Sequence, residues 1–309
     1  MYLVPLLAAV SLEPPYRNAV CLAEHGCNDQ RGTCQTKRTG LPCPFAYSTP
    51  SDGEKARVSN SLKKLSCTVA ASSGDGQAKT MTTVTMGTLA EELIQSSDGE
   101  GGSSWFALAR WIQHPGELGI AQPRHICEIG LNTGLSAVSW LCAHPNAHYT
   151  SFDLLRSNIS RRAVEFIRRA FPGRFDVVVG DTRQTMPRAL DMAASSAARD
   201  HAWPGGAAIK WLRHGCDVLS IDGGHKFNEA MSDVSNMRKA AKLLLHNRKG
   251  HKQPRNVVVM DNLRCGHPMC FNPTKAWKHS VAKGEIIEMG CQVVYSSDGW
   301  CWGTFNTSV

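Results

Sequence analysis

The feature that most restricts the fold is an alternation of short apolar runs with amphipathic stretches, which begins at Arg124. A short apolar run fits a strand that is buried on both faces, and an amphipathic stretch fits a helix with one buried face. This alternation is typical of a parallel α/β sheet. The expected strands are His125 to Ile129, Tyr149 to Phe152, Phe175 to Val179, Asp217 to Ile221 and Asn256 to Met260.

Helices are expected between these strands and ahead of them. The end of the chain has a different pattern, because Gln292 to Tyr295 and Trp300 to Phe305 flank a Ser- and Gly-containing turn and predict a hairpin. The sequence therefore predicts a doubly wound, Rossmann-like α/β fold, mostly parallel with a C-terminal antiparallel hairpin. The expected helices are Thr88 to Ile94, Trp105 to Ile112, Ala137 to Cys142, Ser160 to Phe171, Thr185 to Ala198 and Glu229 to Leu245.

The N-terminal part of the chain differs in composition from the rest. Residues 1–84 are rich in Ser, Thr, Gly, Pro and Lys without a sustained period, so we expect a mostly irregular, cysteine-containing segment followed by one domain over 85–309. Its cysteines would suit disulfides in a secreted chain and idle thiols elsewhere. Met1 to Val10 is apolar but lacks a basic flank, which favours the cytoplasm and leaves the secretory pathway possible. Cys127 and Cys142 lie in apolar runs and are expected to be buried thiols.

Charge and hydropathy exclude some partners. The net charge is +8, but the basic residues are scattered and no aromatic residues interleave with them, so nucleic acid is not an expected partner. No apolar run approaches the roughly 20 residues of a membrane span. The oligomeric state is left open by the sequence.

The first expected strand runs into a glycine-containing loop, Glu128-Ile129-Gly130-Leu131-Asn132-Thr133-Gly134-Leu135-Ser136. Gly130 and Gly134 permit a tight turn and close approach of a ligand. The loop departs from the G-x-G-x-x-G fingerprint, which argues against NAD or FAD. An ordinary strand-to-helix loop is the alternative.

Two acidic residues follow the next strands. Asp153 ends the second strand, where a carboxylate can accept both ribose hydroxyls of a nucleoside. Asp181 follows the third strand, at the edge where open α/β sheets bind ligands. Capping of the following helix is the alternative for Asp181.

Taken together, these residues resemble a class I S-adenosylmethionine-dependent methyltransferase. The E-x-G-x-x-x-G-x-S loop is similar to that of catechol and caffeoyl-CoA O-methyltransferases, and the domain as a whole is most similar to the methyltransferase-24 family over about residues 85–309. The resemblance implies that S-adenosylmethionine is the cofactor and that Asp153 binds its ribose. It also implies that Asp181 lies against the adenine. The other cofactor-binding residues implied are Glu128, Gly130, Asn132, Gly134, Ser136 and Asp222.

A divalent cation is a second expected ligand. Asp222 ends the fourth strand and Asp261-Asn262 ends the fifth, so three oxygen-bearing side chains converge at one sheet edge. Cation-dependent relatives place the same residue types at these strand ends to hold Mg²⁺, although the interval between Asp222 and Asp261 is longer here. Capping of turns in a metal-free enzyme is the alternative.

His225 follows Asp222 by three residues, where the cation-dependent relatives carry a lysine taken to be the general base. A histidine with a near-neutral pKa can do the same work, and a structural histidine is the alternative. We therefore predict O-methylation of a small-molecule hydroxyl. A nucleic-acid or protein methyltransferase and a non-catalytic nucleoside-binding protein are the rival hypotheses.

Overall fold

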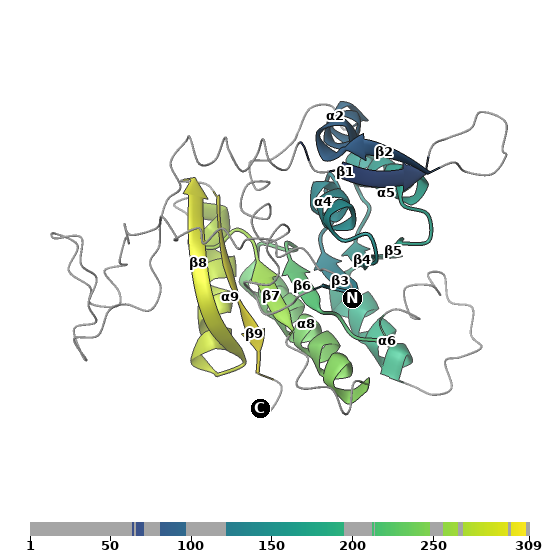
Figure 1. Cartoon of the computed structure of the whole chain (residues 1–309). Helices are drawn as coiled ribbons and strands as arrows, with labels where there is room; N and C mark the ends of the chain where they lie inside the picture. Colours follow the sequence, from purple (N-terminus) through teal and green to yellow (C-terminus); the bar gives the residue numbers. More distant parts are fainter. Residues whose placement is uncertain are drawn as a thin grey trace, which may run out of the picture. The chain divides into compact units, whose positions relative to one another are not determined.

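The computed structural model describes residues 64, 66–70, 81–96, 122–194, 212, 214–247, 256–264, 268–295 and 298–306 (Figure 1). All of them lie in one compact unit, Thr49–Val309. The expected helix at Trp105 to Ile112 falls outside the described residues.

A seven-stranded sheet forms the centre of the described part of the chain, in the order β5-β4-β3-β6-β7-β9-β8. Strands β3 to β7 are parallel, whereas β9 is antiparallel to both β7 and β8. The predicted fold class is confirmed. The strands are β3 (His125–Ile129), β4 (His148–Asp153), β5 (Phe175–Val179), β6 (Val218–Ile221), β7 (Val257–Met260), β8 (Ile286–Tyr295) and β9 (Asp298–Phe305).

Helices cover both faces of this sheet (Figure 1). Helices α4 (Leu135–Ala143) and α5 (Asn158–Ala170) form one layer, and α6 (Thr182–Ala194), α8 (Phe227–Asn247) and α9 (Phe271–Ala282) pack side by side in the other. The chain changes direction across the sheet at β3, which has β4 on one side and β6 on the other. Such a switch point is where open α/β sheets bind ligands. Among the described helices, none is both long and apolar enough for a membrane crossing.

Helix α9 was not predicted from the sequence. Its buried positions, Pro273, Ala276, Trp277 and Ser280, have the helical spacing, but only two of them are strongly apolar or good helix formers. Pro273 lies in the first turn, where its missing N–H costs no helical hydrogen bond. A short 3₁₀ turn, η5 (Pro268–Cys270), leads into this helix.

Two strands lie inside the segment whose composition predicts irregular structure. Strands β1 (Ser66–Ala70) and β2 (Met81–Thr85) pair antiparallel and lead into helix α2 (Met86–Ser96), which packs on α4 and α5. Cys67 and Val69 are buried while Ser66 and Thr68 are exposed, so the run does alternate, but it is only five residues long. The domain boundary at residue 84 stays a prediction.

The expectation that Cys127 and Cys142 are buried free thiols is wrong. Cys127 is bonded to Cys216 and Cys142 to Cys67. A third disulfide, Cys291–Cys301, joins directly opposed residues of β8 and β9. Burial of a thiol in an apolar run does not reveal its partner, since these partners lie 75 and 89 residues away in the sequence.

Candidate active site

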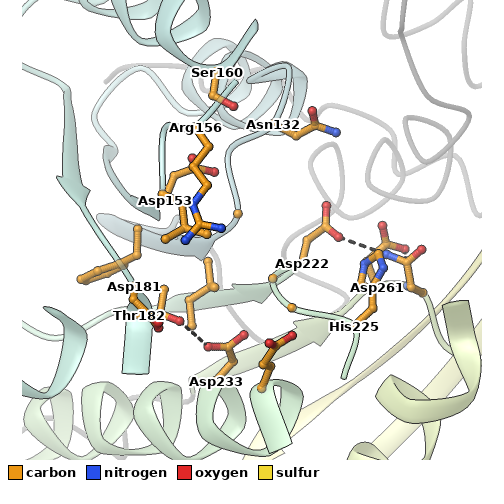
Figure 2. A pocket seen from close by; sticks show the side chains of 18 of the residues that line it. Asn132, Asp153, Arg156, Ser160, Asp181, Thr182, Asp222, His225, Asp233 and Asp261 are labelled. Carbon is orange, nitrogen blue, oxygen red and sulfur yellow. Dashed lines mark hydrogen bonds between the residues drawn. The ribbon is translucent and has the colours of Figure 1, made fainter. Parts of the chain in front are cut away.

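A cavity of about 710 Å³ opens at the carboxyl edge of the sheet, at the switch point beside β3. Figure 2 shows side chains from several strand ends converging on it. Its described lining includes the predicted site residues Gly130, Asn132, Asp153, Asp181, Asp222, His225, Asp261 and Asn262. Glu128, Gly134 and Ser136 are not among the described residues that line it.

Gly130 has no room for a side chain. Its φ is 88°, a conformation that L-residues with a side chain rarely adopt, and a Cβ there would overlap the backbone carbonyl of Asp222. The Asp222 N–H donates to the Ile129 carbonyl at 2.9 Å. The glycine loop therefore packs directly against the end of β6.

Gly134 serves close packing behind the loop. Its φ is 76°, and a Cβ there would lie 2.8 Å from Ile167 Cδ1 and 3.1 Å from Ala163 Cβ. Gly134 thus lets α4 begin against α5. This corresponds to the helix-packing role of a glycine in nucleotide-binding turns.

The Asp153 carboxylate connects two loops at the cavity. Its Oδ2 accepts the Leu131 N–H at 2.7 Å and its Oδ1 accepts the Leu155 N–H at 2.6 Å. A carboxylate has about four acceptor positions, so both oxygens can accept a further hydrogen bond from a ligand. Asp153 is therefore fixed in place without being saturated.

Glu128 is buried behind the glycine loop, on β3. Burial raises the pKa of its carboxyl well above the usual 4.5, and the Ser136 and Tyr149 hydroxyls beside it partly offset the rise. The protonated form is favoured in such a place because a buried carboxylate loses its hydration. Glu128 and Ser136 lie where they can order the loop from behind.

Asp181 precedes the first residue of α6. Its carboxylate accepts hydrogen bonds from the Arg183 side chain and, at 3.0 Å, from the Arg183 backbone N–H. These bonds lower the pKa of Asp181 to about 2. The backbone contact is that of a helix cap, which was the alternative interpretation of Asp181. Asp181 also lines the cavity.

Figure 2 shows Asp222 and Asp261 near one another at one side of the cavity, and Asn262 lines the same cavity. Asn262 Nδ2 donates to Asp222 Oδ1 at 3.0 Å, and the Asn262 N–H donates to Asp261 Oδ1 at 2.7 Å. Asn262 has a φ of 57°, so the chain turns sharply as it leaves β7. The three residues offer carboxylate and amide oxygens only, a donor set that suits a hard divalent cation.

His225 lies at the same end of the cavity, on the loop that joins β6 to α8 (Figure 2). Burial lowers the pKa of its imidazole below 6.5, and the nearby Glu229 carboxylate opposes this. The neutral form, which can take up a proton, is favoured at neutral pH. A neutral imidazole is the form that can act as a general base.

Residues 127–243 match the family model of a methyltransferase domain. The chain carries a methyltransferase domain. The predicted resemblance to S-adenosylmethionine-dependent methyltransferases is thereby confirmed.

Several solved structures are similar to this chain. The methyltransferase is 13% identical to an O-methyltransferase from Bacillus cereus in complex with SAH, which covers 71% of this chain and 91% of that chain at a TM-score of 0.47. It is 15% identical to SAH-bound PaMTH1 from Podospora anserina, over 84% and 99% of the two chains at a TM-score of 0.46. Comparison with curated proteins gave no match.

Several residues that line the methyltransferase cavity were not predicted from the sequence. Arg156 follows Asp153 after a short turn, and Thr182 and Arg183 begin α6. Glu229 and Asp233 reach the cavity from α8. Their sequence surroundings contain no motif, although the four-residue spacing of the two acids places them on one helix face.

Proposed function

We propose that this methyltransferase transfers the sulfonium methyl group of S-adenosylmethionine to a hydroxyl oxygen of a small molecule. The observation that carries the proposal is one cavity lined by the glycine loop at Gly130, with Asp153 on one side and His225 and Asp261 on the other (Figure 2). In this reaction the bond from sulfur to the methyl carbon would break as that carbon bonds to the acceptor oxygen. The hydroxyl proton would pass to His225, and S-adenosylhomocysteine would be released.

The cofactor would occupy the end nearer the glycine loop. The backbone around Gly130 would hold the methionine part, because it is free of side chains there. Asp153 would accept the ribose hydroxyls with the acceptor positions that Leu131 and Leu155 leave open. Asp181 would lie against the adenine. Positioning of the two reactants in line supplies much of the rate in such a reaction.

Asp153→Ala is expected to weaken S-adenosylhomocysteine binding at least about tenfold, because hydrogen bonds to a charged group are each worth roughly 1.5–3 kcal/mol. Isothermal calorimetry on wild type and variant measures the change. Asp191→Ala is the matched control, since Asp191 is exposed on α6 and is not among the described residues that line the cavity. Tight NAD binding with none of S-adenosylhomocysteine would refute the proposed cofactor.

A divalent cation, Mg²⁺ above all, fits the other end. Asp222 and Asp261 would supply carboxylate oxygens and Asn262 its amide oxygen. The amide Nδ2 donates to Asp222 Oδ1, so the amide would have to turn about its Cβ–Cγ bond for its oxygen to join that carboxylate on a cation. A bound cation would lower the pKa of the acceptor hydroxyl and orient it.

Chelation is accordingly expected to abolish turnover, and added Mg²⁺ to restore it. Two neighbouring carboxylates attract a cation strongly, and the acceptor is a poor nucleophile while it is protonated. Methyl transfer is measured with and without a chelator, and Asp261→Ala is assayed beside Asp191→Ala. Full activity in chelator, or in Asp261→Ala, would remove the cation from the mechanism.

The disulfides bear on where the enzyme works. The cysteines that the structure describes are Cys67, Cys127, Cys142, Cys216, Cys270, Cys291 and Cys301, and all of them are disulfide-bonded. Disulfides persist in oxidising compartments and are rare where glutathione keeps thiols reduced. We therefore propose an oxidising compartment for this methyltransferase, in place of the cytoplasm that the N-terminal sequence favours.

A further inference from the structure

Asp233 joins the two loops that wall the cavity. It lies on α8, is 1% exposed, and its Oδ1 accepts a hydrogen bond from Thr182 Oγ1 at 2.8 Å (Figure 2). The backbone N–H of Gly224 donates to the same carboxylate. One side chain therefore holds the first turn of α6 and the loop between β6 and α8.

Neighbouring contacts fix both the first turn of α6 and the loop between β6 and α8 on Asp233. Asn236, one turn further along α8, donates from Nδ2 to the Thr182 carbonyl at 3.2 Å. Gly223 lies between Asp233 and Ile129, and a Cβ there would overlap Asp233 Oδ2 and come within 2.7 Å of Ile129 Cγ2. The loop that carries Asp222 and His225 is thus confined between β3 and α8.

A carboxylate at this buried position has an unfavourable desolvation free energy. Burial raises the pKa of Asp233 to about 6, and the Glu229 and Asp181 carboxylates that face it add to the rise. Arg183 is the nearby opposing charge. An apolar residue of similar volume would avoid the cost of desolvation. Unlike an apolar residue, the carboxylate can accept hydrogen bonds from both Thr182 and Gly224.

We propose that Asp233 is a positioning residue, which sets the separation of the Asp181–Thr182 and Asp222–His225 segments and thereby the fit of the cofactor between them. The proposal rests on the proposed function for its ligand, S-adenosylmethionine. Asp181, Thr182, Gly224 and His225 all line the cavity, so a shift of either loop changes its width. Asp233 reaches the cavity itself, and its proposed role is exerted through these residues.

Asp233→Asn and Thr182→Val test this proposal from its two sides. Asn replaces one carboxylate oxygen of Asp233 with an NH₂ donor, so only one acceptor oxygen is left for Thr182 and Gly224, and Val at position 182 removes the hydroxyl. We expect each variant to weaken S-adenosylhomocysteine binding at least about tenfold and to speed hydrogen exchange in residues 222–226. Thr182→Ser, which keeps the hydroxyl, should restore both values, and the double variant should be no worse than Asp233→Asn alone.

The controls separate positioning from general stability and from the proposed function. Asp191→Asn should match wild type in both measurements, and the melting temperature of Asp233→Asn should change little, because the lost contacts offset the removal of a buried charge. Binding and exchange within twofold of wild type in Asp233→Asn would overturn the positioning role. If wild type binds no S-adenosylhomocysteine, the proposed function fails, and the exchange of residues 222–226 alone decides the role of Asp233.

Discussion

His225→Gln is expected to lower kcat by about 10² to 10⁴ while leaving the Kd for S-adenosylhomocysteine nearly unchanged. His225 lies at the end of the cavity with Asp222 and Asp261, away from Asp153 (Figure 2). Glutamine keeps a polar side chain but cannot take up a proton. The loss should therefore fall on the chemical step and spare cofactor binding.

The dependence of kcat on pH tests the same role of His225. A general base works in its neutral form, and burial lowers the pKa of His225 below 6.5. The wild-type kcat should rise with pH and reach its plateau below the pH at which a free imidazole would, and His225→Gln should lose that rise. His279→Gln is the control, because His279 is exposed on α9. Equal kcat values with superimposable profiles would reduce His225 to a structural residue.

Removal of the Cys127–Cys216 disulfide is expected to cost about 4 kcal/mol of unfolding free energy. The bridge closes a loop of 89 residues, and the chain-entropy model gives about 4 to 5 kcal/mol for loops of that length. It also joins β3 to the residues that lead into β6, the two strands whose ends carry Gly130 and Asp222. The free energy is measured by denaturant unfolding of the Cys127→Ala/Cys216→Ala variant.

The Cys291–Cys301 bridge provides an internal comparison. It closes only 10 residues, so its removal should cost about 2 to 3 kcal/mol. Equal losses for the two bridges would contradict the loop-length argument. Thiol titration of the unreduced native protein should find the described cysteines unreactive, and free thiols at Cys127 and Cys216 would contradict both the bridge and the proposed oxidising compartment.

The sheet could be predicted because burial on both faces leaves a local signature. The β6 and β7 runs are apolar at nearly every position, β3 also contains His125 and Glu128, and all residues of the three strands are buried. Strand β4 carries polar residues as well, and two of them have side-chain partners: Thr150 Oγ1 is 2.9 Å from His125 Nε2, and His148 Nε2 is 2.8 Å from Asp176 Oδ2. The ends of the parallel strands then placed the predicted site residues at one edge.

Other features depend on contacts between distant segments. The role of Asp233 follows from Thr182 and Gly224, and neither forms a motif with it in the sequence. The partner of Cys127 is likewise set by the neighbouring strand order of β3 and β6. Asp181 could be placed at the sheet edge, but its bonds to Arg183 depend on how α6 begins.

The contact between Gly130 and the Asp222 carbonyl has a thermodynamic consequence. Because no side chain separates the two, a ligand that displaces the glycine loop must also displace the end of β6. Ligands at the two ends of the cavity would then be linked. If a ligand at one end raises the affinity of the other end by some factor, the second ligand must raise the affinity for the first by the same factor.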